Sequence, residues 1–365
     1  MKAWPDRRVL DLFGIELPIV LAPMAGPGTA ALAIAVSEAG GLGSLPCAQL
    51  KAEEIRSALQ TIRSRTSRPI NVNFFCHTPP AHDEARDRAW RAALRPYYVE
   101  LGLDPQAPLA PPSRKPFDSE ACALLEQFKP EVVSFHFGLP AQELLDRVKA
   151  TRACVIGSAT TVREARWLEA HGCDAVVAMG LEAGGHRGNF LSDDMARQVG
   201  TFALVPQVVD AIKIPVIAAG GIADERGIVA ALALGASAVQ IGTAYLFCPE
   251  ARVPPLHLEA LTHAADDDTM VTNVFTGRPA RGIVNRLMSE IGPISSAAPR
   301  FPLASSALAP LRAKTEPAGS NDFMNLWSGQ AVSLARRGVP AGELTRMLAF
   351  AALARLRGEA PPRNG

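Results

Sequence analysis

The chain has 365 residues, 48% of them hydrophobic, which is enough for one large domain or two of ordinary size. Its 37 Lys and Arg residues nearly balance its 36 Asp and Glu residues, which argues against a nucleic-acid partner and against a polybasic membrane surface. The six cysteines are scattered without a Cys-x-x-Cys pair, and no apolar run follows the charged N-terminus. These features predict reduced thiols and a cytoplasmic protein without a secretory signal.

Two uncharged stretches, residues 18–37 and 227–249, approach the length of a membrane span. Prolines interrupt the first stretch, and glycines and polar residues interrupt the second. Each stretch also changes between a helix period and a strand period. We therefore expect no membrane-spanning helix.

Short apolar runs alternate with amphipathic helical patterns along most of the chain. The runs are apolar throughout, which is typical of parallel strands that are covered on both faces. Helical patterns follow several of them, as at residues 29–39, 52–63, 162–170 and 226–234. The expected strands are residues 18–23, 41–46, 69–75, 132–136, 153–157, 175–178, 215–219 and 238–241.

Eight such units in about 250 residues predict an α/β fold of the (β/α)₈, or TIM-barrel, type. A doubly wound open sheet is the alternative, because it has the same alternation of strands and helices.

Two regions interrupt the repeat. Residues 78–118 are Pro-rich and charged, and we interpret them as an insertion between the third and fourth strands. Residues 266–334 have a mixed polar composition, which suggests a cap subdomain over the barrel mouth. The barrel itself would then comprise residues 1–265 and 335–365, with a last helical pattern, at 342–357, packed on its outside.

Paired small residues follow the last two expected strands. Gly220 and Gly221 come after the seventh strand and lead into a helix, and Gly242 and Thr243 follow the eighth. In barrels these loops are the usual phosphate site, because small residues let backbone N–H groups approach phosphate oxygens. Tight turns alone are the alternative explanation. The pattern predicts a phosphate-bearing cofactor.

A histidine surrounded by glycines follows the sixth strand, in the segment Met179–Gly188. Histidine is the side chain best suited to move a proton near neutral pH, so His186 is a candidate general base. Its alternative role is to order the loop. His136 also falls at a strand end, and the sequence leaves open whether it is a site residue or a satisfied core group. The other histidines share no ligand spacing, so no metal site is expected.

Several segments together resemble the class I nitronate monooxygenases, formerly called 2-nitropropane dioxygenases. The likeness runs in order from about Gly14 to Arg336. The matching segments are Leu21–Met24, Asn71–His77, Val133–Gly138, Glu182–Gly188, Ala218–Ile222, Gly235–Thr243, Gly277–Gly282, Asn321–Phe323 and Trp327–Gln330.

The resemblance implies an FMN-dependent barrel that oxidises nitronates with O₂ to a carbonyl compound and nitrite. The partners would be a small nitro compound and O₂, and a homodimer is left open. His186 matches the family's catalytic histidine, which takes the α-proton of a neutral nitroalkane. The expected FMN contacts are Ala22, Pro23, Met24, Asn73, Ser158, Met179, Gly184, Gly185, Gly220, Gly221, Gln240, Gly242 and Thr243.

The substrate side departs from the family pattern. His136, Phe301 and Ser305 are expected beside the substrate, but Phe301, Ser305 and Ala309 stand where the family tends to have two tyrosines and a lysine. Met179 replaces a usual flavin-contacting glutamine. The resemblance therefore does not predict that this protein uses the small carboxylated nitronate that is the usual substrate of the family. The alternative function is an FMN-dependent NAD(P)H:quinone or enoyl reductase on the same barrel.

Overall fold

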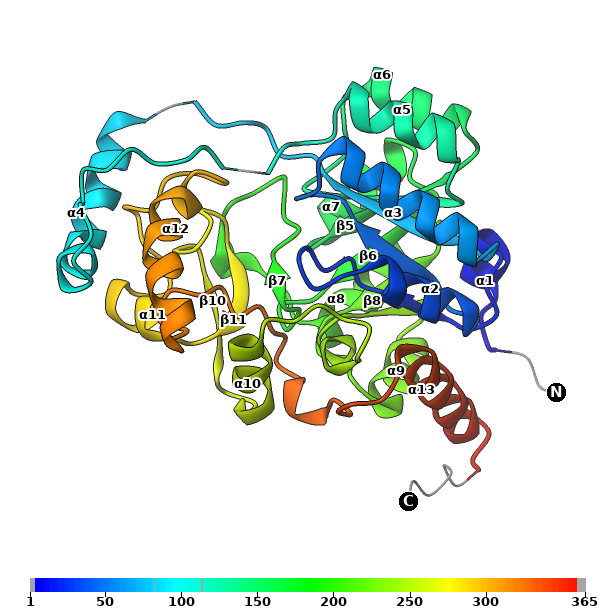
Figure 1. The fold of residues 1–365 in the computed structure, drawn as a ribbon. Coiled ribbons are helices and arrows are strands. Elements are labelled where there is room, and N and C mark those ends of the chain that lie inside the picture. The colour runs from blue at the N-terminus through cyan, green and yellow to red at the C-terminus, as the bar shows by residue number, and fades with distance from the viewer. Residues whose placement is uncertain (1–3, 82, 113, 360–365) are drawn as a thin grey trace.

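The computed structural model describes residues 4–81, 83–112 and 114–359, and its centre is a parallel eight-stranded barrel (Figure 1). The strand order is β1-β9-β8-β6-β5-β4-β3-β2, and a parallel bridge between Val20 and Leu42 joins its two ends. The TIM-barrel prediction is confirmed, and all eight expected strands are present with small shifts at their ends. The strands are β1 (Ile19–Leu21), β2 (Gly43–Pro46), β3 (Ile70–Phe75), β4 (Val132–His136), β5 (Cys154–Ala159), β6 (Ala175–Met179), β8 (Val216–Ala219) and β9 (Ala238–Ile241).

Helices surround the barrel, and their apolar faces form one continuous core with the outward-facing strand residues. Side-chain caps on the first turn begin several of them, from Thr29, Asp118, Thr161 and Asp224. The outer helices are α2 (Ala30–Glu38), α3 (Ala52–Arg65), α5 (Ser119–Phe128), α6 (Gln142–Ala150), α7 (Val162–Ala170), α8 (Thr201–Ala211), α9 (Glu225–Ala233) and α13 (Ala341–Leu356).

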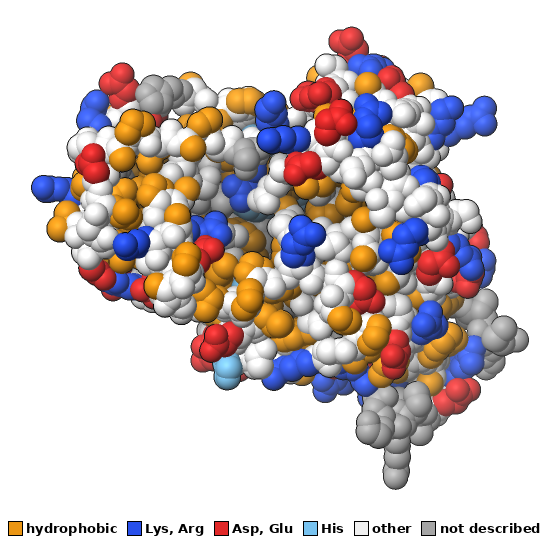
Figure 2. All heavy atoms as spheres, in the orientation of Figure 1, with side chains coloured by type: hydrophobic (Ala, Val, Ile, Leu, Met, Phe, Trp, Pro, Cys, Tyr) orange, Lys and Arg blue, Asp and Glu red, His pale blue; other side chains and the backbone are white. Residues whose placement is uncertain are grey.

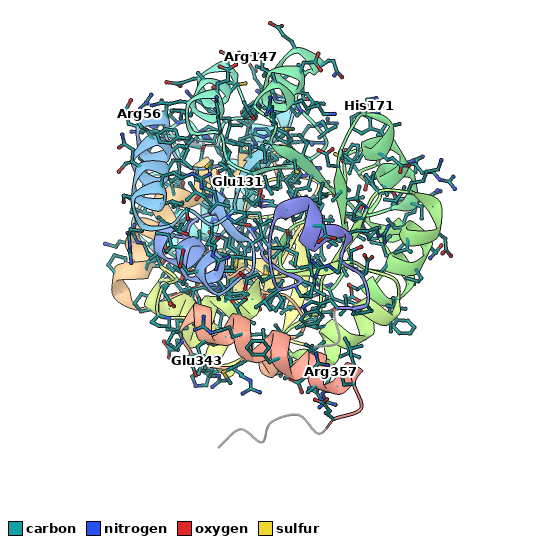
Figure 3. All side chains as sticks on the ribbon, turned by 90° about the vertical axis from the view of Figure 1, so that its right-hand side faces the viewer. Arg56, Glu131, Arg147, His171, Glu343 and Arg357 are labelled. Carbon is teal, nitrogen blue, oxygen red and sulfur yellow. The ribbon has the colours of Figure 1, made fainter. Side chains whose placement is uncertain are left out.

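The N-terminal end of the barrel is closed by α1 (Arg8–Phe13), whose apolar side chains belong to the same cluster as the inward-facing strand residues. Figure 3 looks at the molecule from this end. The labelled Arg56, Arg147 and Glu343 stand at the periphery, on the outer helices. Because this end is packed and plugged, a ligand has to enter from the opposite end.

The insertion packs against the cap. Its helix α4 (Glu84–Glu100) lies on α12 (Ala304–Thr315). The Trp90 indole donates a hydrogen bond to the Ala304 carbonyl at 3.2 Å, and the Tyr98 hydroxyl donates to the Ala307 carbonyl at 2.6 Å. Both rings share one buried apolar cluster with the cap. Insertion and cap therefore form one layer over the barrel mouth.

Arg286 adds a polar connection between these two segments. It begins α11 (Arg286–Ile291), and its guanidinium donates to both carboxylate oxygens of Glu100, each at 2.7 Å. The remaining helices are α10 (Pro255–His263) and the 3₁₀ turns η1 (Met195–Arg197), η2 (Thr243–Phe247), η3 (Glu316–Ala318) and η4 (Val332–Leu334).

A second, three-stranded sheet joins the barrel to the cap. Its order is β10 (Thr269–Thr272), β11 (Ala280–Ile283) and β7 (Gly185–His186). The loop after β6 thus becomes an edge strand, with His186 opposite Ala280. The sequence predicted a loop at this point. The strand forms because the cap supplies its partner.

Within the described parts of the chain, no helix has both the length and the apolar character to cross a membrane. In Figure 2 the cap and the barrel meet at a recess, and Lys and Arg side chains stand at its edge.

Candidate active site

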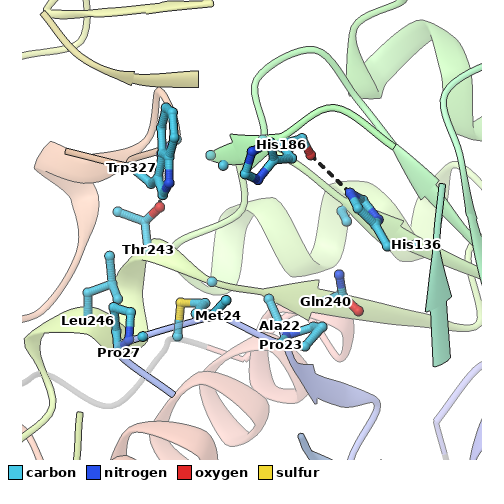
Figure 4. Close-up of a pocket in the computed structure, with 18 of the residues that line it drawn as sticks. Ala22, Pro23, Met24, Pro27, His136, His186, Gln240, Thr243, Leu246 and Trp327 are labelled. Atoms are coloured by element: carbon cyan, nitrogen blue, oxygen red, sulfur yellow. Dashed lines mark hydrogen bonds between the residues drawn. The ribbon is translucent and has the colours of Figure 1, made fainter. Parts of the chain in front are cut away.

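A cavity of about 650 Å³ lies between the C-terminal ends of the barrel strands and the cap. This volume is within the usual range of roughly 300–1,000 Å³ for small-molecule and cofactor sites. Every residue predicted to contact FMN lines it, and so do His136 and His186. In Figure 4 the labelled residues, among them Met24, Gln240, Thr243 and Trp327, surround one central space. The structure therefore brings the predicted cofactor residues and both histidines to one cavity.

The loop after β8 presents backbone donors to this cavity. Gly220 and Gly221 have φ values of 113° and 69°, which L side chains rarely adopt. Among the described residues, no hydrogen bond uses the N–H groups of Gly221, Ile222 or Ala223. All three residues line the cavity, and Ile222 and Ala223 are buried. Buried N–H groups without partners suit an anion.

The helix that follows this loop is capped by its own chain. The Asp224 carboxylate accepts from the N–H groups of Arg226 and Gly227, at 2.9 and 3.3 Å. The N–H groups of Arg226 and Gly227 are thereby satisfied within the chain, and the open donors lie in the preceding loop.

Residues from the end of the cap complete this side of the cavity. The Gly329 N–H donates to the Thr243 hydroxyl oxygen at 2.9 Å. A Cβ on Gly184 would lie 2.5 Å from the Gly329 nitrogen, so only glycine allows this close approach. The side-chain amide of Gln240 has no hydrogen bond to any other described residue. It is therefore available to a ligand.

His136 has both ring nitrogens occupied. Its Nε2 lies 3.1 Å from the His186 carbonyl oxygen, the contact drawn in Figure 4, and its Nδ1 lies 3.0 Å from the Ser158 hydroxyl. A carbonyl only accepts, so Nε2 carries the proton and Nδ1 accepts from Ser158. His136 is therefore a neutral structural donor that holds the backbone of His186.

His186 has one ring nitrogen occupied. Its Nε2 lies 2.9 Å from the Thr276 hydroxyl oxygen, and no hydrogen bond to another described residue occupies Nδ1. Burial holds the pKa of His186 well below its usual range, and the positive charge of Arg114 lowers this pKa further. The imidazole is therefore neutral at pH 7, with a lone pair available on one nitrogen.

Aromatic rings form the wall around this imidazole. The ring centroids of Phe301, Trp327 and Phe75 lie 5.2, 5.5 and 6.0 Å from that of His186. Phe301 is buried in this wall, although it does not line the cavity itself. The wall covers part of the imidazole, and this burial lowers its pKa.

The structure does not bring Ser305 to the cavity. Its hydroxyl donates to the Pro302 carbonyl at 2.9 Å, and Ala309 is exposed to solvent. Arg312, two turns after Ser305 on α12, is the residue of this helix that lines the cavity. Two turns correspond to about 10 Å along a helix axis, so the later half of α12 approaches the site.

Sequence reasoning missed two arginines. Arg114, near the end of the insertion, and Arg312 both line the cavity. Burial lowers the pKa of Arg114 to about 10, and the nearby charge of Arg312 adds to this effect. No local pattern marks either residue, because tertiary packing of the insertion on the cap brings them to the site.

Arg187 fixes the loop that carries His186. It is fully buried, and its guanidinium donates to the carbonyls of Gly180 and Met179, at 2.6 and 2.9 Å. It also donates twice to the Gln198 side-chain oxygen. The carbonyl of Met179 is thereby held by Arg187, while Met179 itself lines the cavity.

We expect the protein to lose stability as the pH falls from 7 to 5. Burial lowers the pKa of His136 to about 3 and contributes most to lowering the pKa values of His77 and His257 to about 4. Unfolded histidines titrate near about 6.5. Between these values the unfolded chain binds more protons than the folded one, so acid favours unfolding, by up to about 1.4 kcal/mol per pH unit for each such histidine.

Urea unfolding at a series of pH values measures this slope. The stabilising contribution is fully present above about pH 6.5 and decreases as the pH approaches the folded values. His257→Gln retains a donor for the Trp327 carbonyl, which His257 Nε2 contacts at 3.1 Å, and should reduce the slope. A free energy of unfolding that is constant from pH 7 to 5 would contradict the neutral, buried state of these histidines.

The fold and this cavity define the class of protein: a TIM-barrel enzyme whose site lies at the C-terminal ends of the strands. A family model described as nitronate monooxygenase matches residues 6–350. A nitronate monooxygenase of Pseudomonas aeruginosa is 43% identical over 343 residues, which cover 93% of this chain and 97% of that one. The chain belongs to the nitronate monooxygenase family, as the sequence motifs predicted, and is an oxidoreductase.

Two solved structures are similar to this chain. A nitroalkane oxidase from Streptomyces ansochromogenes has a TM-score of 0.86 and 38% sequence identity, and the match covers 96% of this chain and 99% of that chain. FabK from Thermotoga maritima has a TM-score of 0.70 and 29% identity, over 98% and 99% of the two chains.

Proposed function

We propose that this protein binds FMN and uses O₂ to oxidise nitronates to a carbonyl compound and nitrite, with His186 as the general base for neutral nitroalkanes. The observation that carries the proposal is the half-buried, neutral imidazole of His186, with Nδ1 available, in a cavity of about 650 Å³ in a member of this family.

The chain's own residues fit FMN. The open N–H groups of Gly221, Ile222 and Ala223 are suitable donors for a phosphate. The Gln240 amide and the Asn73 side chain, which donates to Ser134 on β4, line the same cavity and would offer polar partners to the flavin ring system. When bound, FMN would accept the two electrons that leave the substrate.

The imidazole of His186 would contribute a proton transfer. Nδ1 of His186 would take the α-proton of a nitroalkane, and the bonding electron pair would move into the nitro group as the nitronate forms. A neutral imidazole at pH 7 meets the first requirement of a base. The negative charge that develops on the nitro group would favour the imidazolium, which offsets the low pKa of the free site.

Arg114 and Arg312 would favour an anionic substrate. Both line the cavity, and the charge of Arg114 already affects His186. A nitronate is an anion, so the Arg114 guanidinium should raise its local concentration and fix its orientation, while Arg312 contributes less because Glu316 pairs with it at 2.5 Å. These arginines would supply the positive charge that the lysine usual at position 309 no longer provides.

We expect Arg114→Gln to raise the KM for a nitronate by roughly 10- to 100-fold, the usual worth of a charge-assisted hydrogen bond, with a smaller change in kcat. Arg147→Gln is the matched control, because it removes a positive charge from an outer helix. Steady-state oxygen uptake measures both constants. Equal KM values for Arg114→Gln and Arg147→Gln would exclude a direct role of Arg114 in binding the substrate.

The proposed function is tested by two measurements on the purified protein. An absorbance spectrum should show an oxidised flavin, and the flavin released by heating should be FMN. Oxygen uptake with a panel of nitronates should then give stoichiometric nitrite. Steady NADH consumption without nitronate turnover would instead support the reductase alternative, and a protein that binds no flavin would refute both functions.

A further inference from the structure

The imidazole of His186 is held from outside the barrel, by the hairpin of the cap. Thr276 lies in the turn between β10 and β11, and its hydroxyl oxygen is 2.9 Å from His186 Nε2. The same hydroxyl donates to the Arg278 carbonyl at 3.4 Å. Strand β11 also pairs with the backbone of His186. One hairpin thus holds both the backbone and the ring of this residue.

These contacts specify where the proton of the ring resides. The Arg278 carbonyl only accepts, so it takes the single proton of the Thr276 hydroxyl. The hydroxyl oxygen must then accept from His186, which requires a proton on Nε2. Nδ1 is left with its lone pair. Thr276 is 2% exposed, so solvent does not compete for these bonds.

The comparison with His136 supports this assignment. His136 carries hydrogen bonds on both nitrogens, to a carbonyl and to a hydroxyl, and has no lone pair for a ligand. In His186, only Nε2 has a hydrogen bond to another described residue. The arrangement therefore leaves one basic nitrogen, on one of the two histidines, available to the cavity.

We propose that Thr276 is a positioning residue that holds His186 in its Nε2–H tautomer, so that Nδ1 is the atom that receives the substrate proton. This inference rests on the proposed function. In the transfer, the substrate C–H bond breaks, an N–H bond forms at Nδ1, and the electron pair moves into the nitro group. The proton on Nε2 stays bonded to the ring and keeps its hydrogen bond to the Thr276 hydroxyl oxygen. This oxygen stabilises the positive charge of the imidazolium.

The groups that act on the charge of His186 are Arg114, Arg278, His136 and His77. A substitution at Thr276 leaves all four in place. A change in the pH profile on substitution would therefore report on the Thr276 contact itself.

The test compares Thr276→Val, which removes the hydroxyl at nearly constant volume, with Thr276→Ser, which retains it. We expect Thr276→Val to lower kcat/KM for a neutral nitroalkane by roughly 3- to 10-fold, the worth of one buried hydrogen bond. Its pH profile should shift as well. Oxidation of the preformed nitronate should change by less than about 2-fold, because no proton is removed, and Thr276→Ser should restore the wild-type values.

A second measurement does not depend on activity. The ¹⁵N chemical shifts of the imidazole, recorded on the FMN-loaded protein, distinguish the two tautomers and should identify Nε2–H in the wild type and a mixture in Thr276→Val. An Nδ1–H tautomer in the wild type would overturn the inference, whether or not the variants fold. Equal losses on both substrate forms in Thr276→Val would also overturn it. Absence of any nitronate turnover would refute the proposed function. The ¹⁵N measurement would then still show whether Thr276 sets the tautomer of His186.

Discussion

His186→Asn is expected to lower the rate of neutral nitroalkane oxidation by roughly 10²- to 10⁴-fold, the usual contribution of a positioned general base. The reason is the lone pair on Nδ1, which faces no hydrogen-bond donor among the described residues and which asparagine does not replace. Preformed nitronate has already lost its proton and should lose much less activity. Oxygen-uptake assays with both substrate forms measure the difference.

Two controls make this prediction specific. The flavin spectrum of His186→Asn should remain unchanged, since the cradle of open N–H groups after β8 does not involve the imidazole. His136→Asn removes the donor to the His186 carbonyl but keeps the imidazole base in the protein, so its loss on neutral nitroalkanes should be much smaller than that of His186→Asn. If His186→Asn slowed both forms equally, the imidazole would be a binding residue.

Arg187→Met is expected to destabilise the protein by about 3–5 kcal/mol, which is at the upper end for a single substitution. The guanidinium is fully buried and satisfies two backbone carbonyls and the Gln198 amide oxygen. Methionine would leave the buried Met179 carbonyl and the half-buried Gln198 oxygen without these donors, and the Gly180 carbonyl with the Ala183 N–H alone. Each lost donor costs about 1–3 kcal/mol, reduced by partial rearrangement. Chemical denaturation, followed by far-UV circular dichroism at a fixed flavin concentration, measures the change.

Arg147→Met is the matched control. Arg147 pairs with Glu126 on the surface, where water replaces the lost contacts, so little change in stability is expected. Arg187→Lys should be intermediate, because an ammonium group retains the charge but not the planar set of donors. A stability of Arg187→Met equal to that of Arg147→Met would show that the loop tolerates unsatisfied carbonyls, against the role assigned to Arg187.

The motifs around the barrel mouth were predictable because they are local. Gly220 and Gly221 follow a buried strand, as does the Met179–Gly188 segment. In this fold the C-terminal ends of all the strands lie at one rim, so both segments are expected there. The apolar runs gave the eight strands for a similar reason, since a strand buried on both faces has few other compositions available to it. Family membership followed from the order of these motifs and is confirmed.

The environment of His186 was not predictable from its neighbours in the sequence. Its backbone pairs with β11, its ring contacts Thr276, and its pKa responds to Arg114. Each of these partners is distant in the chain and comes from the cap or the insertion. For the same reason Ser305, which the resemblance led us to expect beside the substrate, lies outside the cavity, while Arg312 on the same helix reaches it.

The sequence by itself determined the barrel, the rim that carries the cavity and the histidine in the loop after β6, because hydrophobic periodicity and strand-end glycines are short-range consequences of the chain. Only the tertiary structure decided which nitrogen of that histidine is available and which positive charges face the substrate. These depend on how the insertion and the cap pack together across the barrel mouth, and contacts between segments far apart in the chain leave no local pattern to read.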